Sequence, residues 1–357
     1  MNDAPASPNA PTPAPQYILQ PRESLFGRFG KLLLVVLVFC IISMMGMASQ
    51  MQEYFGDGRG PRERFHSLSR TATNKIAVVH VSGAIMEGDD FVEKQFEAIE
   101  KDDSVKAVVL RIDSPGGTVT YSDRLFHQAK KLREERDLPM VVSMGSLCAS
   151  GGYYLAMAVG DQENAIYAEP TTWTGSIGVV IPNYNFSRTM NMYGAQDLSV
   201  VSGELKLMGS PTKPRTEEET EVLQELVDIT FEGFKDVVRE GRPKFAADDE
   251  ALDAVATGQV FTAKQAIDNG LVDSIGFLEA AIDRAMQLAN LSPTTARAVE
   301  YEARRTPIEQ FLNASAPEQP ATNGVDLRAL DLQTLVELSS PRAYFLSTMA
   351  PVLLRSN

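Results

Sequence analysis

The chain has 357 residues, of which 44% are hydrophobic and 22% charged, a composition typical of a globular protein with one large domain or two ordinary ones. The formal net charge of −14 argues against nucleic-acid binding, because that binding needs clustered lysine and arginine. The two cysteines are Cys40 and Cys148. Because Cys40 lies inside an apolar run, we expect no disulfide between them.

The N-terminal region divides into a tail and an apolar run. Residues 1–20 are rich in proline, alanine and asparagine, so we expect residues 1–28 to form a disordered cytoplasmic tail. The uncharged run from Leu32 to Ala48, extended to residues 29–51, is nearly long enough to cross a hydrocarbon layer of about 30 Å. It predicts one transmembrane anchor.

The apolar run could be a permanent anchor or a cleaved signal peptide, and its orientation in the membrane has to be predicted separately. A cleaved signal peptide is the alternative, because Gly46 and Ala48 are small residues at cleavage-site spacing. The run is longer than a typical signal-peptide core of roughly 7–15 residues, which favours the anchor. Arg22, Arg28 and Lys31 precede it and favour a cytoplasmic N-terminus. The rest of the chain is then expected on the extracytoplasmic side of the cell (inner) membrane.

The remainder predicts a polar connector over residues 52–73, a folded domain over 74–290 and a C-terminal extension over 291–357. In the domain, strand-like and helical runs alternate, which is expected of a mainly parallel sheet covered by helices. The extension carries one apolar stretch, 344–354, which is too short to span a bilayer. The predicted strands are 75–82, 107–112, 140–144, 165–168, 177–181 and 198–202, and the main predicted helices are 121–136, 151–159 and 216–240.

A pair of glycines follows one of these strands. Asp113-Ser114-Pro115-Gly116-Gly117 lies between a predicted strand and a helical run, where parallel sheets place their ligands. Adjacent glycines let backbone N–H groups approach a substrate, as an oxyanion hole requires. The same pair also suits a tight turn that has no role in catalysis.

A serine lies in the corresponding position after the next strand. Ser150 precedes a predicted helix, where free N–H groups and the helix dipole stabilise negative charge. A simple helix cap is the alternative for Ser150. Ser146 offers a second hydroxyl, and Cys148 is a further conceivable nucleophile, although a cysteine here is more often a packing residue.

A serine nucleophile needs a base. None of the three histidines, His66, His80 and His127, lies in a loop at a strand end, which disfavours a Ser-His-Asp triad. A lysine can serve if burial keeps it neutral. Lys206, between Leu205 and a second leucine, is the best-placed lysine, although most lysines are solvated surface charges.

Five segments in this order resemble the short form of the SppA-type signal peptide peptidase family. They are DSPGG (113–117), SLCASGGYY (146–154), TGSIGV (174–179), SGELKLMGSP (202–211) and GQVFTAKQAIDNGLVDSIG (258–276). The resemblance covers residues 75–290. It implies an α/β fold of the Clp protease/crotonase type, a superhelix of repeated ββα units behind one transmembrane helix.

The resemblance also implies roles for individual residues. Ser150 would be the nucleophile and Lys206 the general base, with Ser176 orienting the lysine. The backbone N–H groups of Gly117 and Gly151 would form the oxyanion hole, with Gly116 as a further candidate. No metal or other cofactor is implied.

The function implied by the resemblance is that of a membrane-anchored serine endopeptidase, which degrades signal peptides or other exported peptides. Because duplicated members divide the dyad between two halves, a single-copy chain is expected to form a ring-like homo-oligomer whose sites combine Ser150 and Lys206 of neighbouring subunits. Two alternatives remain: a non-catalytic crotonase-like protein for binding or assembly at the membrane, and a tethered scaffold acting through its tails. A lysine kept between two leucines favours the enzyme.

Overall fold

The computed structural model describes residues 30, 33–44, 60–88, 90–303 and 343–346. The chain divides into two units, Met1–Arg59 and Gly60–Asn357. In the first unit, residues 33–44 are helical and their apolar side chains are exposed. The rest of the expected tail and anchor, apart from residue 30, lies outside the described residues. Within the described part of the chain, no helix combines the length and the apolar character that a membrane span requires.

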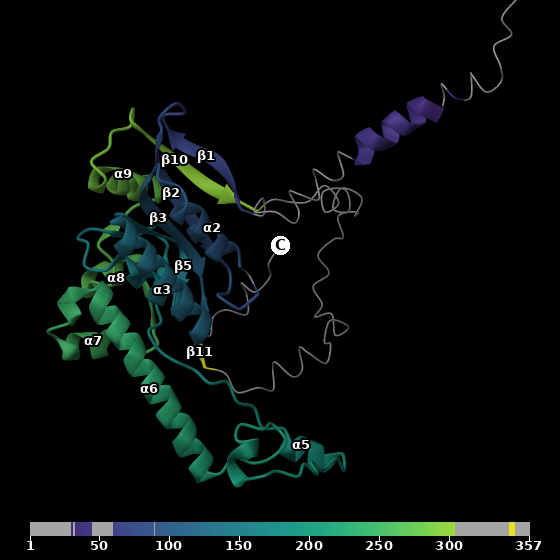
Figure 1. Cartoon of the computed structure of the whole chain (residues 1–357). Helices are drawn as coiled ribbons and strands as arrows, with labels where there is room; N and C mark the ends of the chain where they lie inside the picture. The colour runs from purple at the N-terminus through teal and green to yellow at the C-terminus, as the bar shows by residue number, and fades with distance from the viewer. Residues whose placement is uncertain (1–29, 31–32, 45–59, 89, 304–342, 347–357) are drawn as a thin grey trace, which may run out of the picture. The chain divides into compact units, whose positions relative to one another are not determined.

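The second unit is built on one large sheet with mostly parallel pairing (Figure 1). The central order is β1-β10-β2-β3-β5-β6-β9, and β7 pairs with β5 and β8. Only the β1–β10 and β7–β8 pairs of this sheet are antiparallel. The strands are β1 Arg62–Leu68, β2 Asn74–Ser82, β3 Val105–Ser114, β5 Met140–Ala149, β6 Ile166–Ala168, β7 Trp173–Gly175, β8 Val260–Thr262, β9 Ser274–Ile275 and β10 Ala296–Glu302.

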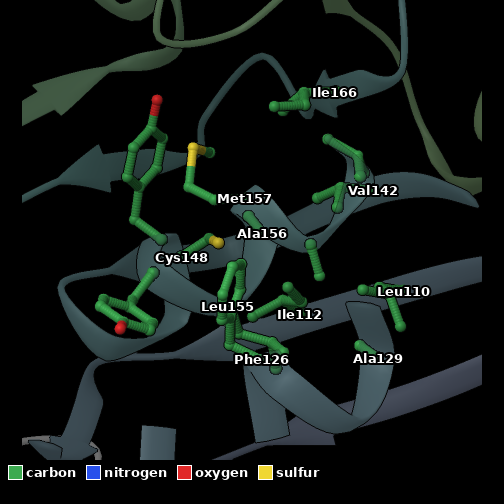
Figure 2. Close-up of a cluster of buried hydrophobic side chains, with 14 of the residues drawn as sticks. Leu110, Ile112, Phe126, Ala129, Val142, Cys148, Leu155, Ala156, Met157 and Ile166 are labelled. Atoms are coloured by element: carbon green, nitrogen blue, oxygen red, sulfur yellow. The ribbon is translucent and has the colours of Figure 1, made fainter. Parts of the chain in front are cut away.

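Helices cover both faces of the sheet. The helical elements of this unit are α2 Phe91–Glu100, α3 Val119–Arg136, α4 Gly151–Ala156, η2 Met157–Val159, α5 Ser187–Met192, η3 Glu204–Leu207, α6 Glu217–Gly241, η4 Pro243–Phe245, α7 Asp249–Val255, α8 Ala263–Asn269 and α9 Leu278–Leu288. Alternate residues of β3 face opposite sides: Val109 packs in the cluster with α9, whereas Leu110 packs in the larger cluster with α3 and α4. Figure 2 shows part of this larger cluster, which contains Leu110 and Val142 of the sheet and Phe126 of α3.

The sheet extends beyond the range 74–290 that we expected for the folded domain. β1 lies within the predicted connector, and β10 lies within the predicted C-terminal extension. The two pair with each other, and β10 also pairs with β2. β1 was missed because its sequence, RERFHSL, is mostly polar, as suits a strand at the edge of a sheet.

Most of the predicted elements are present, including β3, α3 and the long helix α6. A capping box starts α6, in which Thr216 accepts a hydrogen bond from the Glu219 N–H. The prediction of a strand at 198–202 is wrong. These residues are exposed and belong to no strand. The strand predicted at 177–181 is reduced to a single bridge at Val180.

Residues 182–215, which we call the arm, contain no buried residue. They include α5 and η3, and their hydrogen bonds run largely within the arm, as from Phe186 N–H to the Pro211 carbonyl at 2.7 Å. Figure 1 shows α5 and the N-terminal end of α6 away from the sheet. The arm therefore projects from the domain, with α6 as its support.

We expect the C-terminal end of α6 to be fixed by Arg242. Its guanidinium donates to the Gly270 carbonyl and to Asp273 Oδ1, each at 2.7 Å. The other oxygen of Asp273 accepts from two backbone N–H groups at the start of β6. Because the Arg242 side chain is only 11% exposed, Arg242→Ala should lower the free energy of unfolding by about 3 kcal/mol, leaving a buried carboxylate without its cation.

Arg239 is the matched control, since it lies in the last turn of α6, just before Arg242, and its ion pairs are with well-exposed carboxylates. Arg239→Ala should cost about 1 kcal/mol or less. Urea unfolding of both variants measures the difference, and equal losses would contradict the anchoring role of Arg242.

Candidate active site

The predicted site residues from the glycine and serine motifs lie together at the carboxyl ends of β3 and β5. β3 leads into the short strand β4 Gly116–Thr118, and β5 leads through Ser150 into α4. Ser114 pairs with Cys148 across these two strands. Parallel strands end at the same edge, so the two motifs become neighbours although they are far apart in sequence.

Ser150 lies on a strained turn between β5 and α4. Its φ is 53° and its ψ is −114°, a conformation that a non-glycine residue rarely adopts and that clusters at functional sites. The residue is 1% exposed, and its side chain makes no capping hydrogen bond. Its Oγ has no hydrogen-bond partner among the described residues. The alternative of a simple helix cap is therefore not what the structure shows.

Gly117 and Gly151 bring their backbones into contact beside this serine. A Cβ atom at Gly151 would lie 3.1 Å from the Gly117 nitrogen and would overlap Ser122 Oγ. A Cβ atom at Gly117 would overlap the Ile85 carbonyl. Only glycine fits at either position. This close approach of two glycine backbones beside a serine is compatible with the oxyanion hole predicted from the sequence.

Ser176 lies next to the same turn. The Ser150 N–H donates to the Gly175 carbonyl at 2.8 Å, because β7 pairs with the end of β5. Ser176 also has a positive φ, 52°, and its Oγ donates to the Gly258 carbonyl at 3.2 Å. Its hydroxyl thus has a partner from the segment that precedes β8.

Lys206 is the predicted residue that the single chain does not bring to this site. It lies on η3 in the arm and is exposed. Since Ser150 Oγ makes no hydrogen bond, Lys206 Nζ is not within hydrogen-bonding reach of it. A base for Ser150 is therefore absent from the described part of one chain.

The histidines do not supply that base either. His66 Nδ1 lies 2.9 Å from Ser67 Oγ, and His80 Nε2 lies 2.9 Å from Glu300 Oε2. His127 Nδ1 lies 3.0 Å from the Asp123 carbonyl oxygen. None of these contacts involves Ser150, so a Ser-His-Asp triad does not form within the chain.

Cys148 and Ser146, the two other conceivable nucleophiles, lie in surroundings that differ from those of Ser150. Cys148 is fully buried, and burial raises the pKa of its thiol, which disfavours the reactive thiolate. Ser146 is exposed, and its Oγ donates to Asp113 Oδ1 at 2.8 Å. Asp113 Oδ1 also accepts from the Leu147 N–H. Asp113 and Ser146 therefore tie the two motifs together rather than supply a second nucleophile.

A segment near the C-terminus also reaches this site, and apart from the apolar stretch at 344–354 no pattern in the sequence indicates it. The strand β11 Tyr344–Leu346 pairs antiparallel with β4, so that Phe345 lies opposite Gly117. Because β11 is short and lies far from β4 in the sequence, no local sequence pattern predicts this pairing.

Comparison with known proteins agrees with this arrangement. The model of "Peptidase family S49" matches residues 132–292. A protein of Enterococcus faecium named "Putative signal peptide peptidase SppA" is 36% identical over 66% of this chain and 70% of its own length. "Serine protease SPPA, chloroplastic" of Arabidopsis thaliana is 34% identical over 58% of this chain. "Protease 4" of Haemophilus influenzae is 32% identical over 62% of this chain.

The coverage of these relatives differs. The match spans only 30% of the Arabidopsis protein and 36% of the Haemophilus protein, whereas it spans 70% of the Enterococcus protein. The matched family region holds Ser150, Ser176 and Lys206 but begins after the two glycines of β4. Because the match to the Enterococcus protein covers most of that protein and agrees with the family model, the chain belongs to peptidase family S49, a family of serine peptidases, and is of the SppA type.

Proposed function

We propose that this chain is a membrane-anchored serine endopeptidase that degrades signal peptides or other exported peptides, with Ser150 as nucleophile and Lys206 of a neighbouring subunit as general base. The observation that carries the proposal is the state of Ser150. Its hydroxyl is buried on a strained turn beside the closely packed backbones of two glycines, yet it has no hydrogen-bond partner among the described residues. Such a site is complete except for the base.

A second chain is the natural source of that base. The arm carries Lys206 and also large apolar side chains in solvent, among them Val200, which is 99% exposed. Exposed apolar surface of this kind marks interaction sites. The other exposed apolar residues of the arm are Tyr184, Phe186, Met192, Tyr193, Leu198, Val201 and Leu205, and α6 adds Leu226 and Ile229.

A ring satisfies this requirement for every subunit at once. If the arm of one chain covers the site of the next, the same head-to-tail contact repeats by rotation until the ring closes. Burial of the arm against a neighbour would remove Lys206 from water, which favours the neutral amine that can accept a proton. Ser176, beside the Ser150 turn, would then orient that amine.

The fold and the location are further parts of the proposal. The large parallel-rich sheet with helices on both faces is compatible with the Clp protease/crotonase superhelix of ββα units. The helical residues 33–44 expose apolar side chains, which supports an anchor within residues 29–51. The basic residues before the run favour a catalytic domain on the extracytoplasmic side of the membrane.

The proposed reaction proceeds in two stages. Neutral Lys206 removes the Ser150 proton while Oγ bonds to the peptide carbonyl carbon, and the carbonyl electron pair moves to the oxygen beside the N–H groups of Gly117 and Gly151. The tetrahedral intermediate collapses, the C–N bond breaks, and the protonated lysine returns the proton to the leaving amine. Water, deprotonated by the same lysine, then attacks the acyl carbon, the bond to Ser150 Oγ breaks, and the lysine returns the proton to Oγ.

A non-catalytic protein for binding or assembly is the second candidate. The exposed position of Lys206 in the single chain favours it, because such a protein needs no lysine near Ser150. The two candidates differ in whether Ser150 and Lys206 are needed for peptide hydrolysis.

Ser150→Ala and Lys206→Arg should each lower kcat/KM for an unstructured peptide by at least about a hundredfold, since one lacks the nucleophile and the other carries a permanently charged side chain. Fluorogenic peptide hydrolysis by the full-length chain in detergent measures this loss. The matched controls are Ser146→Ala and Lys213→Arg, a serine in the same turn and a lysine in the same arm. Both should keep most of the activity, because the Leu147 N–H still donates to Asp113 when the Ser146 hydroxyl is removed. Full activity in Lys206→Arg would show that the base lies elsewhere.

Mixing the two inactive variants tests the division of the site between chains. In a ring that assembles at random from equal amounts of Ser150→Ala and Lys206→Arg subunits, half of the chains keep the serine and half of their neighbours keep the lysine. About one site in four should therefore be complete. Activity near a quarter of the wild-type value is expected after subunit exchange. Mixed oligomers that form, as shown by native mass spectrometry, but stay inactive would place the dyad within one chain.

A further inference from the structure

Two buried hydroxyl groups of the domain differ from the others. The side chain of Ser122, on α3, is fully buried, and its Oγ, like that of Ser150, has no hydrogen-bond partner among the described residues. Every other buried serine or threonine in the described part of the chain has a partner. These residues are Ser114, Thr118, Ser143, Thr172, Thr174 and Ser176.

The two unpaired serines meet at Gly151. Ser150 precedes this glycine in the chain, and Ser122 approaches it from α3, because a Cβ atom on Gly151 would overlap Ser122 Oγ. The same Cβ point lies 3.1 Å from the Gly117 nitrogen. The Ser122 hydroxyl is therefore packed against Gly151 on the side that faces Gly117. It lies beside both of the glycines that are predicted to form the oxyanion hole.

Gly116, the further candidate for this hole, is engaged elsewhere. Its N–H donates to Ser114 Oγ at 3.1 Å, so it is not free to donate to a substrate oxygen. Gly117 and Gly151 remain as the backbone donors. The nearest side-chain hydroxyl without a partner, apart from the nucleophile itself, is that of Ser122.

Packing does not explain why residue 122 is a serine. Alanine has the same Cβ atom and is the better helix former, and it would leave no buried polar atom without a partner, which costs free energy. A serine hydroxyl, in contrast, carries a proton that it can donate. A donor that is unused in the resting site can stabilise charge that appears only during the reaction. Such a hydrogen bond lowers the barrier without tightening the binding of the substrate.

We propose that Ser122 is a catalytic residue whose hydroxyl donates a third hydrogen bond to the oxyanion of the tetrahedral intermediate, beside the N–H groups of Gly117 and Gly151. This inference rests on the peptidase function proposed above. The substrate oxygen gains its charge when Ser150 Oγ bonds to the carbonyl carbon, and it loses that charge when the intermediate collapses. Ser122 keeps its proton throughout, so it needs no base of its own.

Ser122→Ala in the full-length chain in detergent tests this role. For an unstructured peptide, kcat should fall by about tenfold or more while KM changes by no more than about twofold, because the lost hydrogen bond forms only in the transition state. The midpoint of urea unfolding should stay the same or rise, since the variant lacks an unpaired buried polar atom.

The matched control is Ser143→Ala. Ser143 is also a fully buried serine, but its hydroxyl accepts a hydrogen bond from Arg111 at 2.9 Å. Its removal should lower the urea midpoint, because a buried donor loses its acceptor, and it should leave kcat unchanged. The two variants are therefore expected to move activity and stability in opposite ways.

An unchanged kcat in Ser122→Ala would overturn the proposal, because the hydroxyl would then make no contact in the transition state. So would a Ser122→Ala chain that does not fold, that loses as much stability as Ser143→Ala, or whose weaker activity comes from a higher KM. Each of these results would assign the hydroxyl to folding or to substrate binding. Absence of hydrolysis already in the wild-type chain would instead reject the peptidase function itself, and this inference with it.

Discussion

A buried serine hydroxyl without a hydrogen-bond partner is the constraint on which the account of this protein depends. Ser150 Oγ is removed from water, lies on a backbone turn with a positive φ, and finds no base in the described chain. An unpaired buried polar group and a strained turn both cost free energy. Strained turns and unpaired polar groups are retained at sites where function requires them. The function of Ser150 therefore depends on which group becomes the partner of its hydroxyl.

The surrounding structure answers part of that question. The glycines of β4 and α4 permit a backbone approach that any side chain would prevent, and the sheet holds the two turns in register through Ser114 and Cys148. The arm presents Lys206 and a set of apolar side chains to solvent, where they gain nothing in an isolated chain. A neighbouring subunit would supply the base and cover this surface by a single contact.

The sequence predicted the fold where the pattern was local. Apolar runs such as Ala107–Ile112 become β3 because a strand buried on both faces must be apolar throughout, and the serine and glycine motifs met because both follow parallel strands. The edge strand β1 was missed because its residues are polar. The strand expected at 198–202 failed because the apolar residues there face solvent instead of a core. Neither the partner of Lys206 nor the pairing of Phe345 with Gly117 is encoded in a local pattern.

The proposed mechanism requires Ser150 to be a nucleophile that Lys206 activates. A fluorophosphonate probe measures this most directly, because the serine oxygen displaces fluoride and leaves a stable adduct that mass spectrometry can locate. An adduct on Ser150 of the wild-type protein is expected, formed at least about a hundredfold more slowly in Lys206→Arg, since the proposed general base is lost. An adduct on another residue, or an unchanged rate at Ser150 in Lys206→Arg, would contradict it.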